Sequence, residues 1–297
     1  MEASSIHHGY RLRPLAPARG GALALALACL LTLAAGGWAV RAAETTEAKA
    51  APAGDAGVAA LRAKAEAGDA KAQLILGVCY VQGAHVKKDP AEGVKWFKKA
   101  AEQGYAPAQY NLGVCYDEGQ GVAKDPQEAV KWFKKAAEQG HAKAQCNLGA
   151  YYVNGQGVEQ DPKEAVKWFK KAAEQGDAKA QYALGQCYRE GQGTTQDHKE
   201  AVKWYQKAAE QGHTASQYNL GTCYVNGQGV TQDLKEAVKW FKKAAEQGGA
   251  YAQYNLGACY ANGLGVEKDL QEAKKWYEKA AAQGHKDAAK RLQEMKK

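Results

Sequence analysis

Apolar residues recur along most of the chain in a pattern that repeats every 36 residues. In one copy they stand at i, i+3, i+4, i+7 and i+8, with lysines between them: Ala129, Trp132, Phe133, Ala136 and Ala137. This spacing places the apolar side chains on one face of a 3.6-residue helix and the lysines on the other. The pattern predicts an amphipathic helix, which we call helix B.

The residues around helix B predict where it begins and ends. Asp125 is a favoured N-cap residue, Pro126 suits the first helical position, and Glu128 is placed to bond back to the cap. Gly140 follows the last apolar residue, where a left-handed backbone conformation commonly ends a helix.

A second helix, helix A, is predicted from about Ala106 to Asp117. At 100° per residue one side of it gathers four residues: Ala108, Leu112, Cys115 and Tyr116. Gly113 costs about 1 kcal/mol inside a helix relative to alanine. Its recurrence predicts close packing of helix B at this point, with Trp132 as the neighbour. A glycine turn at 118–122 joins the helices, and Val122 is expected to lie under the pair.

The aromatic pair of helix B occurs once in each copy of the repeat and so shows how many copies the chain contains. It occurs six times: Trp96/Phe97, Trp132/Phe133, Trp168/Phe169, Trp204/Tyr205, Trp240/Phe241 and Trp276/Tyr277. A period of this length predicts one stacked array in which each unit is stabilised by its neighbours. The units are 69–104, 105–140, 141–176, 177–212, 213–248 and 249–284, and shorter segments at 57–68 and 285–297 are predicted to cap the array.

The recurring positions carry a family resemblance. They are Ala108, Leu112, Gly113, Tyr116, Gly119, Gly121, Val122, Asp125, Ala129, Trp132, Lys135, Ala136, Ala137 and Gly140. Together they resemble the Sel-one-like repeat (SLR), a 36-residue relative of the tetratricopeptide repeat. The resemblance implies an all-α fold, a right-handed superhelical solenoid of antiparallel helix pairs that serves as an adaptor or scaffold. It also implies an alternative, since some secreted bacterial members are linked to peptidoglycan-related ligands.

The copies differ from one another at a few positions. In the first unit, Gly83-Ala84-His85-Val86 replaces the two-glycine turn and Gly93 replaces the helix B alanine, which predicts looser packing there. In the fourth unit Thr194 stands where the other turns have an apolar residue.

The amino terminus has the features of an export signal. Arg11, Arg13 and Arg19 precede an uncharged run from Gly20 to Val40. Residues 1–42 are therefore predicted to be a signal peptide cleaved after Ala42. The alternative is an uncleaved membrane anchor formed by residues 20–40, a length that just spans a bilayer. Residues 43–56 are small and polar and are predicted to be a flexible linker. The array is expected to be exported, periplasmic or extracellular, or to be tethered to a membrane.

The net charge of +8 does not predict a nucleic-acid partner. Within a repeat, Lys131, Lys134 and Lys135 alternate with Glu128 and Glu138, so charges of both signs are interspersed on the helix surface. A protein that follows a phosphate backbone needs a denser patch of one sign.

Five cysteines share one helix A position: Cys79, Cys115, Cys187, Cys223 and Cys259. Equivalent helices in neighbouring repeats lie about 8 to 10 Å apart, whereas a disulfide needs Cα atoms within about 4.4 to 6.8 Å. These cysteines, and Cys146 in the third unit, are predicted to be free thiols buried as small apolar side chains.

No catalytic, cofactor or metal site is predicted. His141, His213 and His285 share a turn position but lie about 20 Å apart, too far to share a metal ion, and are expected to be surface turn residues. The recurring acidic residues at helix B starts are explained by capping. Ser216 is the only serine of the array, so a serine hydrolase mechanism lacks its nucleophile motif.

The remaining candidates for function lie on the side of helix A that is predicted to face outward as a ladder of aromatic and amide side chains. They are Tyr110, Asn111, Val114, Tyr182, Gln186, Tyr218, Asn219, Thr222, Tyr254, Asn255 and Ala258. Tyrosines in such a row offer contact area at low entropic cost. The alternative is that they pack between successive A helices.

These observations lead to three hypotheses. The first is a non-catalytic adaptor that binds a protein or peptide in the concave groove. The second is a cell-envelope protein that binds peptidoglycan fragments, and the third is a hydrolase acting on cell-wall or β-lactam substrates.

Overall fold

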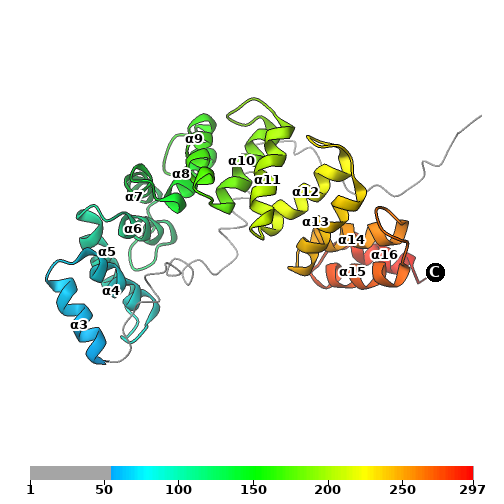
Figure 1. The fold of residues 1–297 in the computed structure, drawn as a ribbon. Coiled ribbons are helices and arrows are strands. Elements are labelled where there is room, and N and C mark those ends of the chain that lie inside the picture. The colour runs from blue at the N-terminus through cyan, green and yellow to red at the C-terminus, as the bar shows by residue number, and fades with distance from the viewer. Residues whose placement is uncertain (1–54, 297) are drawn as a thin grey trace, which may run out of the picture. The chain divides into compact units, whose positions relative to one another are not determined.

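The computed structural model describes residues 55–296, which form 14 α-helices and no strand (Figure 1). The helices are α3 (Asp55–Glu66), α4 (Ala70–Gln82), α5 (Pro90–Glu102), α6 (Ala106–Glu118), α7 (Pro126–Glu138), α8 (Ala142–Asn154), α9 (Pro162–Glu174), α10 (Ala178–Glu190), α11 (His198–Glu210), α12 (Thr214–Asn226), α13 (Leu234–Glu246), α14 (Ala250–Asn262), α15 (Leu270–Ala282) and α16 (Lys286–Glu294). Even numbers from α4 to α14 are the A helices, and odd numbers from α5 to α15 are the B helices.

The described residues divide into two compact units. One comprises 55–183 and 192–194, and the other comprises 184–191 and 195–296. In the first, each helix from α3 to α8 packs against the helix that follows it, and in the second the same holds from α11 to α15. The predicted all-α repeat architecture, in which every helix is held by its neighbours, is confirmed.

Both predicted ends of helix B are present, with one difference. In α7 the Asp125 carboxylate accepts the amides of Gln127 and Glu128 at 3.0 and 3.1 Å. The predicted return bond from Glu128 to the cap is wrong. The Asp125 amide donates instead to the Tyr116 carbonyl at 2.9 Å, and Glu128 pairs with Lys131. The cap amide is thus already satisfied by the end of helix A.

The glycine of helix A lies against an aromatic ring of helix B. A Cβ atom on Gly113 would stand 2.7 Å from two ring carbons of Phe133, closer than real side chains approach. The predicted neighbour, Trp132, was wrong because the two aromatic side chains point into different cores. Phe133 packs with Leu148 of the next repeat, whereas Trp132 packs against the cluster that contains Leu112.

The second glycine of each turn joins a repeat to the one before it. Gly121 has φ +73°, and a Cβ there would lie 2.2 Å from the carbonyl oxygen of Pro90, the first residue of the preceding helix B. The same approach recurs at four further pairs: Gly157/Pro126, Gly193/Pro162, Gly229/His198 and Gly265/Leu234. Only glycine fits so close to another backbone.

The first repeat is packed more closely than predicted. Its Gly93 lies where other B helices have alanine, and a Cβ there would stand 2.7 Å from Val81 and 2.8 Å from the Gly77 carbonyl. The glycine therefore lets α4 and α5 approach. His85, in the place of the second turn glycine, keeps the left-handed conformation with φ 59°.

Polar side chains connect the repeats through their interior. The buried Gln109 donates from Nε2 to the Ala101 carbonyl at 3.1 Å, near the end of the preceding helix B. Its own Oε1 accepts Nε2 of Gln139, at the end of α7, at 2.7 Å. This second bond lies within one repeat and recurs four more times: Gln73/Gln103, Gln145/Gln175, Gln217/Gln247 and Gln253/Gln283.

The two predicted caps are single helices. Helix α3 begins at Asp55, two residues inside the predicted linker, and buries Leu61 and Ala65. Helix α16 buries Ala288 against the last repeat. The predicted leader at 1–42 and the rest of the linker lie outside the described residues.

Replacing Gly113 by alanine tests the close approach of α6 and α7. Overpacking costs about 1 to 3 kcal/mol, and the better helix propensity of alanine returns about 1 kcal/mol, so we expect a net loss of stability in urea denaturation followed by circular dichroism. Phe133→Leu, which removes the ring edge, should make the same glycine substitution less costly. Equal or greater stability of Gly113→Ala alone would contradict this packing.

Candidate functional site

The side chains predicted to face outward from helix A are mostly buried. Nine of the eleven have exposed fractions of only 2% to 8%: Tyr110, Asn111, Val114, Gln186, Asn219, Thr222, Tyr254, Asn255 and Ala258. Tyr182 and Tyr218 are half-buried. The predicted outward ladder is therefore wrong for these nine residues, because neighbouring helices cover this side of helix A. A binding role for Tyr182 and Tyr218 stays a prediction.

Ring contacts explain the burial of the tyrosines. The Tyr110 ring lies 5.8 Å from that of Phe133 and stacks on His141 at 4.8 Å. Burial raises the pKa of Tyr110 well above its usual range, so its hydroxyl stays protonated. The alternative that these tyrosines pack between successive helices describes Tyr110 correctly.

Within residues 55–296, the most exposed large apolar side chain is one that the sequence did not single out. Tyr251, in the first turn of α14, is 61% exposed. Its ring centre lies 6.2 Å from that of Tyr218 and 5.1 Å from that of His285, which also stacks on Tyr254 at 4.6 Å. We call these four residues the Tyr251 cluster. The available signal was that the equivalent position varies among repeats: Lys71, Pro107, Lys143, Lys179, Ala215 and Tyr251.

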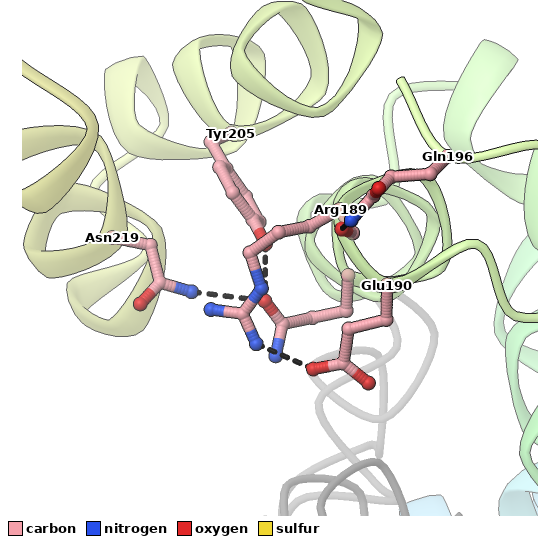
Figure 2. A network of polar contacts seen from close by, with 6 residues as sticks. Arg189, Glu190, Gln196, Tyr205 and Asn219 are labelled. Atoms are coloured by element: carbon pink, nitrogen blue, oxygen red, sulfur yellow. Dashed lines mark hydrogen bonds and ion pairs between the residues drawn. The ribbon is translucent and has the colours of Figure 1, made fainter. Parts of the chain in front are cut away.

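A polar network distinguishes the fourth repeat (Figure 2). Gln186 Oε1 accepts the hydroxyl of Tyr205 and, at 3.1 Å, Nδ2 of Asn219. Tyr205 occupies the helix B position that is phenylalanine in four repeats, and Gln186 occupies the position of Val114. The two polar substitutions satisfy each other, and they tie α10, α11 and α12 together.

An ion pair lies beside this network. Nη2 of Arg189 is 2.6 Å from Oε1 of Glu190, and the side chains are only 15% and 17% exposed. The Arg189 carbonyl accepts Nε2 of Gln196 at 2.8 Å, which fixes the end of α10 (Figure 2). Burial raises the pKa of Cys223 to about 11, and the guanidinium of Arg189 acts in the opposite direction.

The cysteines of residues 55–296 are all thiols, and five of the six are buried as predicted. Cys146 is half-buried. Burial raises the pKa of Cys115 and of Cys259 to about 12, so both remain protonated near neutral pH. Thiolates are the reactive and metal-binding form, and this environment disfavours them. Residues 55–296 contain no group of three histidine, cysteine or acidic side chains arranged to hold a metal ion.

The three turn histidines have a role that the sequence did not reveal. His141, His213 and His285 are N-cap residues of α8, α12 and α16, and each accepts an amide with its side chain. They are half-buried rather than simple surface residues. Their place directly before the first helical residue was the signal, although histidine is not among the strongly favoured caps.

In the described part of the chain, no helix combines the length and apolar character needed to cross a bilayer.

Helix pairs repeated at 36 residues, joined through glycine turns and buried glutamines, define a class of α-helical repeat scaffold. The chain belongs to the Sel1 repeat family. The family model matches residues 70–105, 106–141, 142–177, 178–213, 214–249 and 250–285, one residue later than the units counted from the aromatic pairs. Sel1 repeat proteins are generally non-catalytic and mediate protein–protein interactions.

Among the solved structures that are similar to this chain, two share more than a third of its sequence over most of its length. One is a protective antigen present in uropathogenic Escherichia coli strains that displays an SLR fold, with 44% identity and a TM-score of 0.77 over 79% of this chain. That match covers 50% of the antigen, so this chain spans about half its length. The other is a Sel1 repeat protein from Oxalobacter formigenes, with 37% identity, a TM-score of 0.70, and coverage of 82% of this chain and 96% of that one. No curated protein matches.

The Gln186 network predicts a non-additive mutant cycle. Gln186→Val leaves the buried Tyr205 hydroxyl without its acceptor and should cost about 1 to 3 kcal/mol. The double variant Gln186→Val/Tyr205→Phe restores the residues of the second repeat and should recover most of that loss in thermal unfolding. Additive losses in the double variant would contradict the coupling.

Proposed function

We propose that this protein is a non-catalytic adaptor that binds a protein or peptide partner through the Tyr251 cluster. The observation that carries the proposal is the 61% exposed ring of Tyr251, backed by the rings of Tyr218 and His285. Exposed tyrosines held by neighbouring rings lose little entropy on binding and are common anchors of protein interfaces.

The exposed surface of the B helices is less suited to selecting a partner. On each helix B one lysine pairs with a glutamate of the first turn, as Lys131 does with Glu128. Another lies over the indole of the same helix, as Lys135 Nζ does 4.0 Å from the Trp132 ring centre. These charges are compensated within the helix and repeat almost unchanged, so they offer little that is specific.

The two other hypotheses have less support. Binding of peptidoglycan fragments follows from the earlier resemblance alone, and we treat it as an outcome of the binding test. The hydrolase hypothesis gains no support from Cys115, Cys223 or Cys259, because burial raises the pKa of each of these thiols and disfavours the thiolate.

The Tyr251 proposal is tested by Tyr251→Lys, which introduces the residue found at the equivalent position in three other repeats. Crosslinking capture from the exported fraction should recover the same proteins with the wild type and with Leu270→Lys. That control also removes an exposed apolar side chain, which is 51% exposed. Capture by Tyr251→Lys should fall about tenfold, as for the loss of a hot-spot residue.

Equal capture by Tyr251→Lys and wild type would remove the cluster as the anchor. If purified peptidoglycan retains the wild type but not Tyr251→Lys, the result would support the cell-envelope hypothesis, with peptidoglycan as the ligand of the Tyr251 cluster.

We further propose that the array acts outside the cytoplasm, either released by cleavage after Ala42 or held by residues 20–40. The basic and apolar leader supports this, as does the description of a 44% identical relative as a protective antigen. The intact mass of protein recovered from the cell envelope should correspond to a chain that begins at Ala43, or to the full chain if the leader is an anchor. Recovery of the full chain in the soluble cytoplasmic fraction would contradict export.

A further inference from the structure

The A helices, and α16 at the equivalent place after the last repeat, differ in how their first turn is capped. Tyr105 and Gly249 make no side-chain bond to the first turns of α6 and α14. Histidine caps three of the helices. Ala144, Ser216 and Ala288 donate their amides to Nδ1 of His141, His213 and His285 at 3.2, 3.3 and 3.4 Å. Aspartate caps two others, since Asp69 and Asp177 accept the equivalent amides at 2.7 and 2.8 Å. Histidine caps thus stand two repeats apart, and an aspartate cap lies between the first two.

Only one protonation state of histidine can act in this way. A neutral imidazole that accepts at Nδ1 carries its proton on Nε2, whereas an imidazolium has two donors and no acceptor. Protonation therefore removes the acceptor and places a positive charge at the positive end of the helix dipole. Aspartate accepts through a carboxylate that remains charged until well below pH 5.

We propose that the histidine caps are acid-sensitive. The first turns of α8 and α16 weaken as the pH falls through the range of imidazole titration, whereas the first turns capped by aspartate keep their caps. An unperturbed imidazole titrates near pH 6.5. Above this pH the caps are present and their stabilisation is complete. Below it, protons bind the unfolded or uncapped chain in preference to the capped chain, and the stabilisation is lost.

The groups around His141 come from three helices. The first turn of α8 contains no acidic residue, and Lys143 is exposed there. Glu138 and Lys135 in the last turn of α7 offset each other. On the α6 side the ring stacks on Tyr110 at 4.8 Å, whose hydroxyl stays protonated because burial raises its pKa. The charges of Asp177 and Glu118 also raise the pKa of Tyr110.

Charged and polar side chains also lie near the other two caps. The first turn of α16 contains Lys286 and Asp287, and α15 and α16 supply further charges of both signs through Glu278, Lys279, Arg291 and Glu294. At His213, Nδ1 is 2.9 Å from the Ser216 hydroxyl, which can accept a bond from the imidazolium. Glu210 and Lys207 of α11 lie near its base. We therefore expect the first turns of α8 and α16 to weaken more than that of α12, because the Ser216 hydroxyl offers an acceptor to a charged His213.

Amide hydrogen exchange of the full chain at pH 7.5 and 5.5, corrected for the intrinsic pH dependence, tests the proposal. Loss of one cap corresponds to a several-fold change in local opening. We expect exchange at Ala144 to rise about fivefold relative to that at Ala180, the amide capped by Asp177. His141→Asn keeps a side-chain acceptor that does not titrate, and it should abolish the rise.

His198→Asn is the matched control. His198 also stands at a helix start, but Asp197 caps that helix, so this substitution should leave the rise at Ala144 intact. Thermal unfolding at pH 7.5 checks that each variant is folded. Equal pH responses at Ala144 and Ala180, or a rise that persists in His141→Asn, would overturn the proposal.

Discussion

The buried amide of Gln109 is the contact on which the stacking of repeats depends. A single helix pair is too small to bury a core, so the fold exists only where one pair meets the next. Gln109 donates to the end of the preceding helix B and accepts from the end of its own, so its buried amide donor is satisfied in one register only. Sliding a repeat along its neighbour would leave this donor unpaired, at a cost comparable to the loss of a core contact.

The sequence was sufficient for the elements because their signals are local. Asp125, Pro126 and Gly140 determine helix ends through bonds within a few residues, and the aromatic pair defines the period. The packing partners were harder to predict. A helical projection separates a face that meets one partner from a face that does not, whereas helix A has neighbours on several sides. Tyr110 was therefore assigned to the surface although the rings of Phe133 and His141 cover it.

The residues of the candidate site were also hard to predict from the sequence. Positions with the same residue in all repeats are needed for packing between repeats. Chemistry that is specific to one repeat is therefore found where that repeat differs from the others. Tyr251, the Arg189–Glu190 pair and the histidine caps are all such departures. Their variability was visible in the sequence, but their exposure and hydrogen bonding were not, because both depend on which side chains of the adjacent repeat lie opposite.

The glutamine hydrogen bonds also affect how the number of repeats in such a protein can change. Gln109 bonds to the Ala101 carbonyl of the block before it, and the Ala137 carbonyl of its own block accepts Gln145 of the block after it. Every copied block of 36 residues therefore brings both the donor for the block before it and the acceptor for the block after it. Duplication of a block creates a new interface that is complete from the start. Length can therefore change by whole repeats without any coordinated second mutation, while selection acts separately on the few side chains that each copy does not need for stacking.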